Sequence, residues 1–393
     1  LPPGMELSFI SRDLLESLDI MEAKDSDLSV GLRPFVEKNI NQFHAEVHYE
    51  EPDLRLLRLD FSLTSKRSLV KAAAFLNKLD SVPGSQSAEN PYATLQMLLQ
   101  AAPELLHSFP SYIEIEFSAT SEAKNYFSPL SVIEQPKGLL NRPHFGKIKE
   151  YIATGLGDTS VCASGLGEPL EHPEAIEFLQ ELLEDPNIRQ VFVETNGLQL
   201  EKLRSLASHE FAGKLRVIVL LNSLERYEEF SGAPKASLAA LKKSIQGLTA
   251  DLIVAGKNAA EIVYLQALKV EENEGEIDAL YALAEELGTS FLFQKYNRYA
   301  GLMPERRVSD MTPLERYSCW HLRRDLFIRA NGDVAFCKQT IDSSKPTARG
   351  NLSKDTLQDI WALQRQDFVL NFQGKYPAHL PCAGCDEFFT FNY

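Results

Sequence analysis

Cysteine, tryptophan and methionine are scarce in this sequence of 393 residues, which contains five, two and five of them. So few cysteines in a long chain exclude a small scaffold held together by disulfides. Long apolar runs are also missing, since stretches such as Val217 to Leu221 fall far short of the roughly 18 residues that span a bilayer. Positive charge is in deficit as well. The 40 Lys and Arg face 55 Asp and Glu, and this net charge of −15 argues against binding to nucleic acid or to an anionic membrane.

The rest of the composition is that of a folded enzyme-sized protein. Hydrophobic residues make up 44% and charged residues 24%, and the length predicts two or three domains. No charged and then apolar leader opens the chain, so we expect a cytoplasmic protein whose partner is a small molecule or another protein. The first residue is Leu1, followed by Pro2, which we interpret as a trimmed or internal start.

The cysteines are clustered, because four of the five fall in the last 75 residues. Cys319, Cys337 and the pair Cys382-Ala-Gly-Cys385 could fill one tetrahedral thiolate site, and both zinc and iron-sulfur sites use such a two-residue knuckle. The alternative is that they are four reduced thiols buried as small apolar residues. We expect the fifth, Cys162, to be a buried strand residue.

Other side chains near the cysteines are weaker candidates. His321 follows Cys319 by two residues and His379 precedes Cys382 by three, and we expect both to lie outside the metal's own ligand set. We interpret the basic pair Arg323-Arg324 as part of a solvated face.

The chain divides into three predicted segments: residues 1–108, an α/β segment; 109–310, where short apolar runs alternate with helical patterns; and 311–393, where acidic and basic residues balance. The polar stretch from Ser81 to Pro91 is the best linker candidate. Strands are predicted at Tyr112–Glu116, around Val161, at Val191–Val193, Leu215–Leu221, Ile262–Leu265 and Phe291–Phe293. Helices are predicted at Pro173–Leu183, Leu200–Ala207, Leu238–Leu248 and Ile277–Leu287.

This alternation predicts a parallel sheet or partial barrel with helices outside, and ligands at the carboxyl ends of the strands. In the last segment, Asn331-Gly332 predicts a hairpin turn between Phe327-Ile328 and Val334–Phe336, with Cys337 at its far end.

Two turns carry residues that could bind a ligand at those strand ends. Glycines after a strand let a ligand approach the backbone, and a carboxylate there could accept hydrogen bonds from an ammonium group. Each turn is equally explained as a connection that needs glycine or Asn-Gly geometry. The candidate residues are Gly165, Gly167, Glu168 and Pro169 in the first turn and Glu194, Thr195 and Asn196 in the second.

Taken together, these segments resemble the radical S-adenosylmethionine (radical SAM) barrel. The residues that carry the resemblance are Ile113-Glu-Ile-Glu116, Gly165-Leu-Gly-Glu-Pro-Leu170 with His172-Pro173, and Glu194-Thr-Asn-Gly197. The last segment resembles the SPASM domain appended to many such proteins, through Cys319-Trp320, Asn331-Gly-Asp-Val334, Cys337, Gly350-Asn-Leu352, Ile360-Trp361 and Cys382-x2-Cys385-Asp386. The resemblance implies an α/β fold: a partial (β/α)6 barrel, then a domain whose four cysteines bind one auxiliary 4Fe-4S cluster. It also implies that the two turns bind S-adenosylmethionine.

One feature of the family is missing. Its barrels hold a 4Fe-4S cluster through a Cys-x3-Cys-x2-Cys loop after the first strand, and here Ser121, Asn125 and Ser128 occupy those places. Neither hydroxyl nor amide groups replace thiolate in such a cluster. We therefore expect a degenerate barrel without radical chemistry, so that S-adenosylmethionine binding is in doubt.

The N-terminal segment from Glu46 to Ala74, and especially Leu56 to Ser65, faintly resembles the end of a nucleotide-sugar-forming transferase domain, in which a strand with a Thr-rich turn leads into a late helix. This combination is most similar to the spiro-SPASM family. The leading hypothesis is an iron-sulfur protein that acts by binding or electron transfer. Two alternatives stay open: an active radical SAM enzyme with an unusual or partner-supplied cluster, and a zinc-stabilised scaffold.

Overall fold

The computed structural model describes residues 11–13, 16, 32–42, 54–84, 90–133, 138–233, 237–341, 348–378 and 380–389. The chain separates into two compact units, Leu1–Ala101 and Ala102–Tyr393. This differs from the three predicted segments in two ways. The first boundary lies before residue 108, and the barrel and the C-terminal segment share one unit because their strands belong to one sheet.

The described part of the first unit is helical. Its helices are α2 (Leu32–Lys38), α3 (Lys66–Leu79) and α4 (Pro91–Ala101), and α3 is capped by Ser65. The strand that the resemblance implies within residues 56–65 is not present, since Arg55–Leu57 form a 3-10 turn and Arg58 and Leu63 have positive φ (46° and 59°). The described residues of this unit contain no strand, so its predicted α/β character is not found in them. The linker candidate lies within this unit, with residues 85–89 outside the described ranges.

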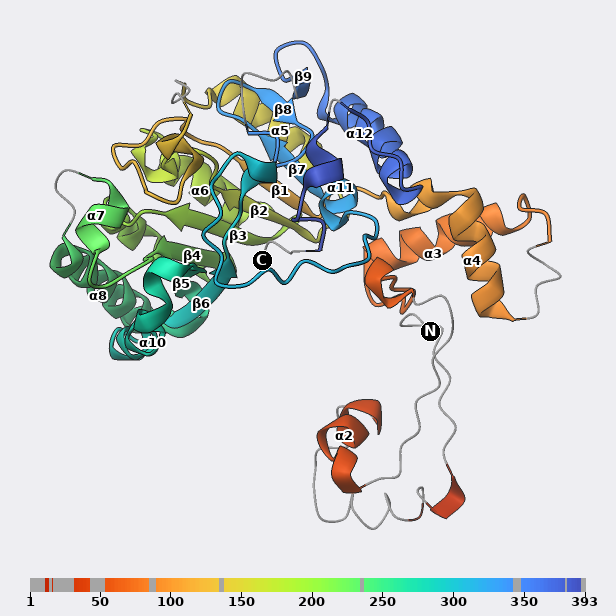
Figure 1. The fold of residues 1–393 in the computed structure, drawn as a ribbon, viewed down its shortest axis with the longest axis horizontal. Helices are drawn as coiled ribbons and strands as arrows, with labels where there is room; N and C mark the ends of the chain where they lie inside the picture. The colour runs from red at the N-terminus through yellow and green to blue at the C-terminus, as the bar shows by residue number, and fades with distance from the viewer. Residues whose placement is uncertain are drawn as a thin grey trace. The chain divides into compact units, whose positions relative to one another are not determined.

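A sheet of nine strands organises the second unit (Figure 1). All six strands predicted for the barrel are present, and each pairs in parallel with the next along the chain. They are β1 (Tyr112–Ile115), β2 (Thr159–Ala163), β3 (Ile188–Thr195), β4 (Leu215–Leu220), β5 (Val263–Lys269) and β6 (Ser290–Lys295).

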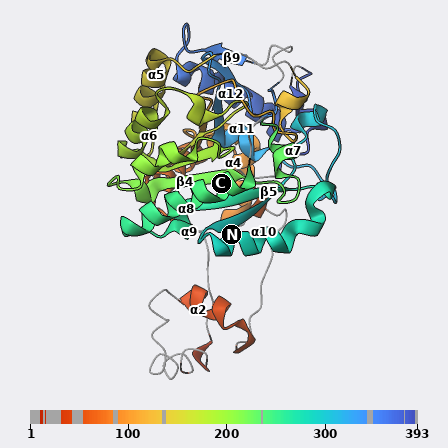
Figure 2. The same ribbon diagram turned by 90° about the vertical axis from the view of Figure 1, so that its left-hand side faces the viewer.

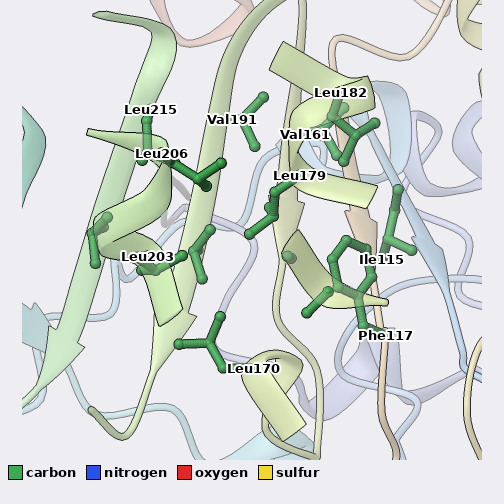
Figure 3. Packing of buried hydrophobic residues seen from close by; sticks show 14 of the residues in the cluster. Ile115, Phe117, Val161, Leu170, Leu179, Leu182, Val191, Leu203, Leu206 and Leu215 are labelled. Atoms are coloured by element: carbon green, nitrogen blue, oxygen red, sulfur yellow. The ribbon is translucent and has the colours of Figure 1, made fainter. Parts of the chain in front are cut away.

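Helices cover the outer face of this sheet, as the two views in Figures 1 and 2 show. They are α5 (Arg142–Ala153), α6 (Ala175–Glu184), α7 (Tyr227–Ser231), α8 (Leu238–Val254), α9 (Ala259–Ile262) and α10 (Ile277–Glu286). The helix predicted at 200–207 is a 3-10 helix, η8 (Leu200–Leu206). Outward strand residues such as Val161 and Val191 pack with Leu179 of α6 and Leu203 of η8 in the main core (Figure 3). Removal of this apolar surface from water is the chief source of stability for the unit.

Every second residue of a strand points to the inner face of the sheet. Successive inward residues therefore form two layers along the strands. The layer near the start of the strands is apolar and contains Tyr112, Cys162, Phe192 and Ile218. Two residues further along, the inward positions are polar in five of the six barrel strands. They are Glu114, Ser164, Glu194, Gln266 and Gln294, and all of them line a cavity.

The C-terminal segment continues the same sheet on the other side of β1. β7 (Asp325–Ile328) pairs in parallel with β1, and β8 (Asp333–Ala335) and β9 (Ala348–Asn351) follow in antiparallel order. The predicted hairpin is confirmed, with Phe327 opposite Ala335 and Gly332 at a φ of 84° in its turn. Helices α11 (Trp320–Arg324) and α12 (Leu357–Phe372) complete this part.

No helix in the described ranges combines the length and the apolar character that crossing a membrane requires.

Candidate functional site

A cavity of about 490 Å³ lies where the carboxyl ends of the barrel strands meet the C-terminal segment. Parallel α/β sheets bind their ligands at this end. The cavity is lined from the barrel by the polar inward residues and from the C-terminal segment by all four clustered cysteines, Cys319, Cys337, Cys382 and Cys385.

The four cysteines reach the cavity from three places in the chain. Cys319 immediately precedes α11, and Cys337 follows β8. Cys382 lies within the short turn η12 (Pro381–Gly384), and Cys385 directly follows it. None of the five cysteines forms a disulfide, and Cys337 and Cys382 are buried. All four thiols thus line one cavity, and their role as a common ligand set stays a prediction.

Burial raises the pKa of every one of these thiols. The pKa of Cys382 rises to about 11 and that of Cys385 to about 12. After burial, the nearness of other thiols is the next cause for Cys319 and Cys337. Within the described ranges, no three His, Cys, Asp or Glu side chains already stand in a metal-binding arrangement. The set of donors fits a thiolate metal centre, and a bound metal would hold these sulfurs deprotonated.

Polar contacts fix the segments that carry the cysteines. Arg316 donates to the carbonyl oxygen of Cys385 at 3.0 Å, and the backbone N–H of Cys319 donates to Asn371 of α12 at 2.9 Å. Arg307 donates to Asp386 at 2.8 Å, directly after the knuckle. These bonds position the backbone around the thiols without using the sulfur atoms.

The weaker candidates have other partners. The Nδ1 of His321 lies 2.6 Å from a carboxylate oxygen of Asp325, and His379 lies outside the described residues. The solvated face expected for Arg323 and Arg324 is wrong. Arg323 is buried and stacks over Trp320, and the side chain of Arg324 is 12% exposed and pairs with Asp325.

Cys162 is fully buried among apolar residues on β2, which confirms its predicted structural role.

The three residues that we expect at the places of the family's cluster cysteines make hydrogen bonds within their own loop. Ser121 accepts a hydrogen bond from the backbone of Ala123 (3.1 Å), and Asn125 accepts one from Phe127 (2.9 Å). Ser128 caps the turn η6 (Pro129–Ser131) by accepting from Leu130 (3.3 Å). All three line the cavity, but as side chains that close local turns.

The glycines of the first turn are required by packing against β1 and the loop after it. A Cβ atom at Gly167 would lie 2.2 Å from the backbone oxygen of Ser118 and 2.5 Å from that of Thr120. Gly165 has a φ of 118°, and a Cβ there would meet Glu116 at 2.8 Å. Both glycines line the cavity as well, so a packing role does not exclude contact with a ligand.

The candidate carboxylate of Glu168 is already bound by three donors of the protein. Its oxygens accept from the backbone of Leu170 (3.1 Å), from the hydroxyl of Thr195 (2.8 Å) and from the backbone of Asn196 (2.8 Å). Burial nevertheless raises its pKa to about 7. Glu168 thus ties the first candidate turn to the second. Glu168, Glu194 and Asn196 line the cavity, whereas Pro169 and Thr195 are not among the described residues that do so.

A charged cluster inside the barrel was missed by the sequence analysis. The ammonium group of Lys338, next to Cys337, lies 2.9 Å from Glu114 on β1 and 3.6 Å from Glu194 on β3. Burial raises the pKa of Glu114 and would lower that of Lys338, but the two carboxylates outweigh it and raise the pKa of Lys338. A usable signal was present, since polar residues recur two positions after the apolar inward residues of the strands.

Comparison with known proteins decides the nature of the C-terminal segment. Residues 319–386 match the SPASM family, described as an iron-sulfur cluster-binding domain. The second unit ends in a SPASM domain. All four clustered cysteines lie within the matched residues.

Other proteins resemble the chain over most of its length. A protein of Treponema pallidum (strain Nichols), itself uncharacterized, is 28% identical over 369 residues, which are 91% of this chain and 97% of the relative. The structure of Streptococcus suis SuiB bound to S-adenosylmethionine matches with a TM-score of 0.51 and 15% identity, over 81% of this chain and 83% of SuiB. SuiB bound to its precursor peptide SuiA matches with a TM-score of 0.50 and 15% identity, over 75% and 78%. The family match confirms the predicted SPASM domain, and the likeness to SuiB confirms the predicted fold. The closer assignment to the spiro-SPASM family stays a prediction.

Proposed function

We propose that this protein carries one 4Fe-4S cluster in its SPASM domain and none in its barrel, and that it acts in electron transfer or in ligand binding without generating radicals. Cys319, Cys337, Cys382 and Cys385 would hold the cluster. Four protein thiolates complete the ligand sphere of such a cluster, which then supplies one-electron transfer and leaves no iron open to a substrate.

One observation carries the proposal, namely the use of Ser121, Asn125 and Ser128 as local hydrogen-bond acceptors. A barrel cluster needs three soft thiolate ligands in this loop, and the loop offers two hydroxyls and an amide that already close its turns. The only other cysteine of the chain, Cys162, is enclosed by apolar strand residues.

S-adenosylmethionine is a secondary proposal. SuiB, which shares the fold, is bound to it in one structure, and the cavity of this chain is large enough for a small molecule. The three protein donors to Glu168 count against a strong site, because they already use most of the roughly four acceptor sites of a carboxylate. A small molecule or a protein as partner, and a cytoplasmic location, are part of the same proposal.

The test is the content of iron, acid-labile sulfide and zinc per chain after anaerobic purification and reconstitution. We expect about four irons and four sulfides. About eight of each would show a second cluster and return the chain to the active enzymes, and one zinc without sulfide would make the domain a structural zinc site.

A matched pair of variants assigns the metal to its ligands. Cys382→Ala should lose the iron and the absorption near 400 nm, whereas Cys162→Ala should keep both. In the same preparations, formation of 5′-deoxyadenosine from S-adenosylmethionine and a strong reductant should be absent, and its detection would contradict the proposal.

A further inference from the structure

In the barrel interior, the ammonium group of Lys338 lies against two carboxylates in the way that an amine ligand would. Lys338 belongs to the SPASM domain, yet its ammonium group lies among inward residues of the barrel strands. The side chain of Glu114 is 3% exposed, that of Glu194 is 17% exposed and that of Lys338 is 20% exposed. Burial of such charges is costly unless each is paired, so the two carboxylates need a cation at this place.

The barrel side of this cluster is built to hold an ammonium group. The hydroxyl of Ser164 donates to Glu114 at 2.5 Å and thereby orients the carboxylate. Glu114 and Glu194 stand on strands separated only by β2, so the spacing of the two acids is fixed by the sheet rather than by a loop. The two carboxylates carry two negative charges and Lys338 balances only one of them, so the site favours cations.

We propose that Glu114 and Glu194 form a binding site for a primary ammonium group, that Lys338 fills it here as an internal ligand, and that a free alkylamine fills it when Lys338 is absent. The site shares the cavity with the thiol donors, but the proposal uses none of the sulfur atoms and names no metal. By filling it, Lys338 ties the segment that carries Cys337 to the interior of the barrel.

The experiment is chemical rescue of the full-length chain. Lys338→Ala removes three methylene groups and the ammonium group, which together correspond to n-propylammonium. We expect the melting temperature to fall by roughly 5 to 10 °C, because two buried carboxylates lose their counter-charge. Added n-propylammonium should restore at least half of this loss, rising with concentration as mass action requires. Tetramethylammonium at equal ionic strength, which has no N–H donor, should not.

Two further variants separate a built site from a general effect of amines. Lys202→Ala removes a lysine whose ammonium group donates to the backbone oxygen of Leu170 at 2.7 Å, and n-propylammonium should not rescue it. Lys338→Ala combined with Glu114→Gln should lose the rescue, because the closer acceptor has lost its charge. If Lys338→Ala is obtained only unfolded, its refolding yield with n-propylammonium and with tetramethylammonium decides the question in the same way. Equal effects of the two cations, or equal rescue of Lys202→Ala, would overturn the proposal.

Discussion

The glycine turn after β2 allows a direct test of whether its residues serve packing or a ligand. In Gly167→Ala the new methyl group would meet two backbone oxygens, of Ser118 and Thr120, at 2.2 and 2.5 Å. Backbone atoms cannot rotate away, so the turn must shift and the hydrogen bond from Glu168 to the oxygen of Thr120 (2.9 Å) is lost. Overpacking costs about 1 to 3 kcal/mol and the hydrogen bond about 1 kcal/mol. We expect a loss of about 2 to 4 kcal/mol.

The assay is denaturant unfolding of the protein without added ligand. Gly146→Ala is the matched control, since Gly146 lies in α5 with nothing within 4 Å of the added methyl group. There the same change should stabilise the chain by up to about 1 kcal/mol, because alanine favours the helix. The reasoning is refuted if Gly167→Ala is as stable as the natural chain and only S-adenosylmethionine binding is impaired.

Three other changes probe separate parts of the second unit. Replacing Trp361 by Phe removes the indole donor to the backbone oxygen of Ser108 (2.8 Å) and should cost about 1 to 2 kcal/mol in urea unfolding; no change would mean that water replaces the donor. The folded-state pKa of Glu168 is about 7, above its ordinary value of 4.5. The stability that this shift contributes is therefore complete below pH 4.5 and is lost as the pH rises through 7. The loss in the free energy of unfolding should reach up to about 3 kcal/mol. Glu168→Gln should flatten this slope in unfolding curves at pH 5 and 8, and an unchanged slope would assign it to another group. Reconstituted Cys385→Ser should contain far less iron than the natural chain by elemental analysis, and full retention would remove Cys385 from the ligand set.

The sheet of the second unit was predictable because its signal is local and repeated. Apolar runs of strand length alternate with helical patterns, and the six barrel strands follow in that order. The hairpin before Cys337 was equally clear, since Asn331-Gly332 favours one turn geometry. In the first unit the run from Leu56 to Ser65 misled, because its apolar content resembles a strand while Arg58 adopts a left-handed conformation.

The cysteine thiols of the candidate site were predictable from the sequence, and the charged side chains around them were less so. Clustering of four cysteines in the last 75 residues already pointed to one site, and their convergence needed no knowledge of the fold. The strand pattern marks Glu114 and Glu194 as inward polar residues, but Lys338 lies more than 200 positions from Glu114 and no local pattern pairs the two. The burial of Arg323 and Arg324 was not predicted for the same reason. The sequence of a basic pair does not tell whether solvent or an aromatic ring covers it.

The parallel pairing of β7 with β1 has a practical consequence for anyone who wishes to study the barrel by itself. In the intact chain β1 is an interior strand, with β2 on one side and β7 on the other. Cutting the chain near residue 310 would turn β1 into an edge strand whose backbone groups and fully buried side chains face solvent. Such an edge recruits strands from other molecules. A barrel expressed without its SPASM domain should therefore precipitate, and its insolubility would say nothing about whether the barrel binds a ligand.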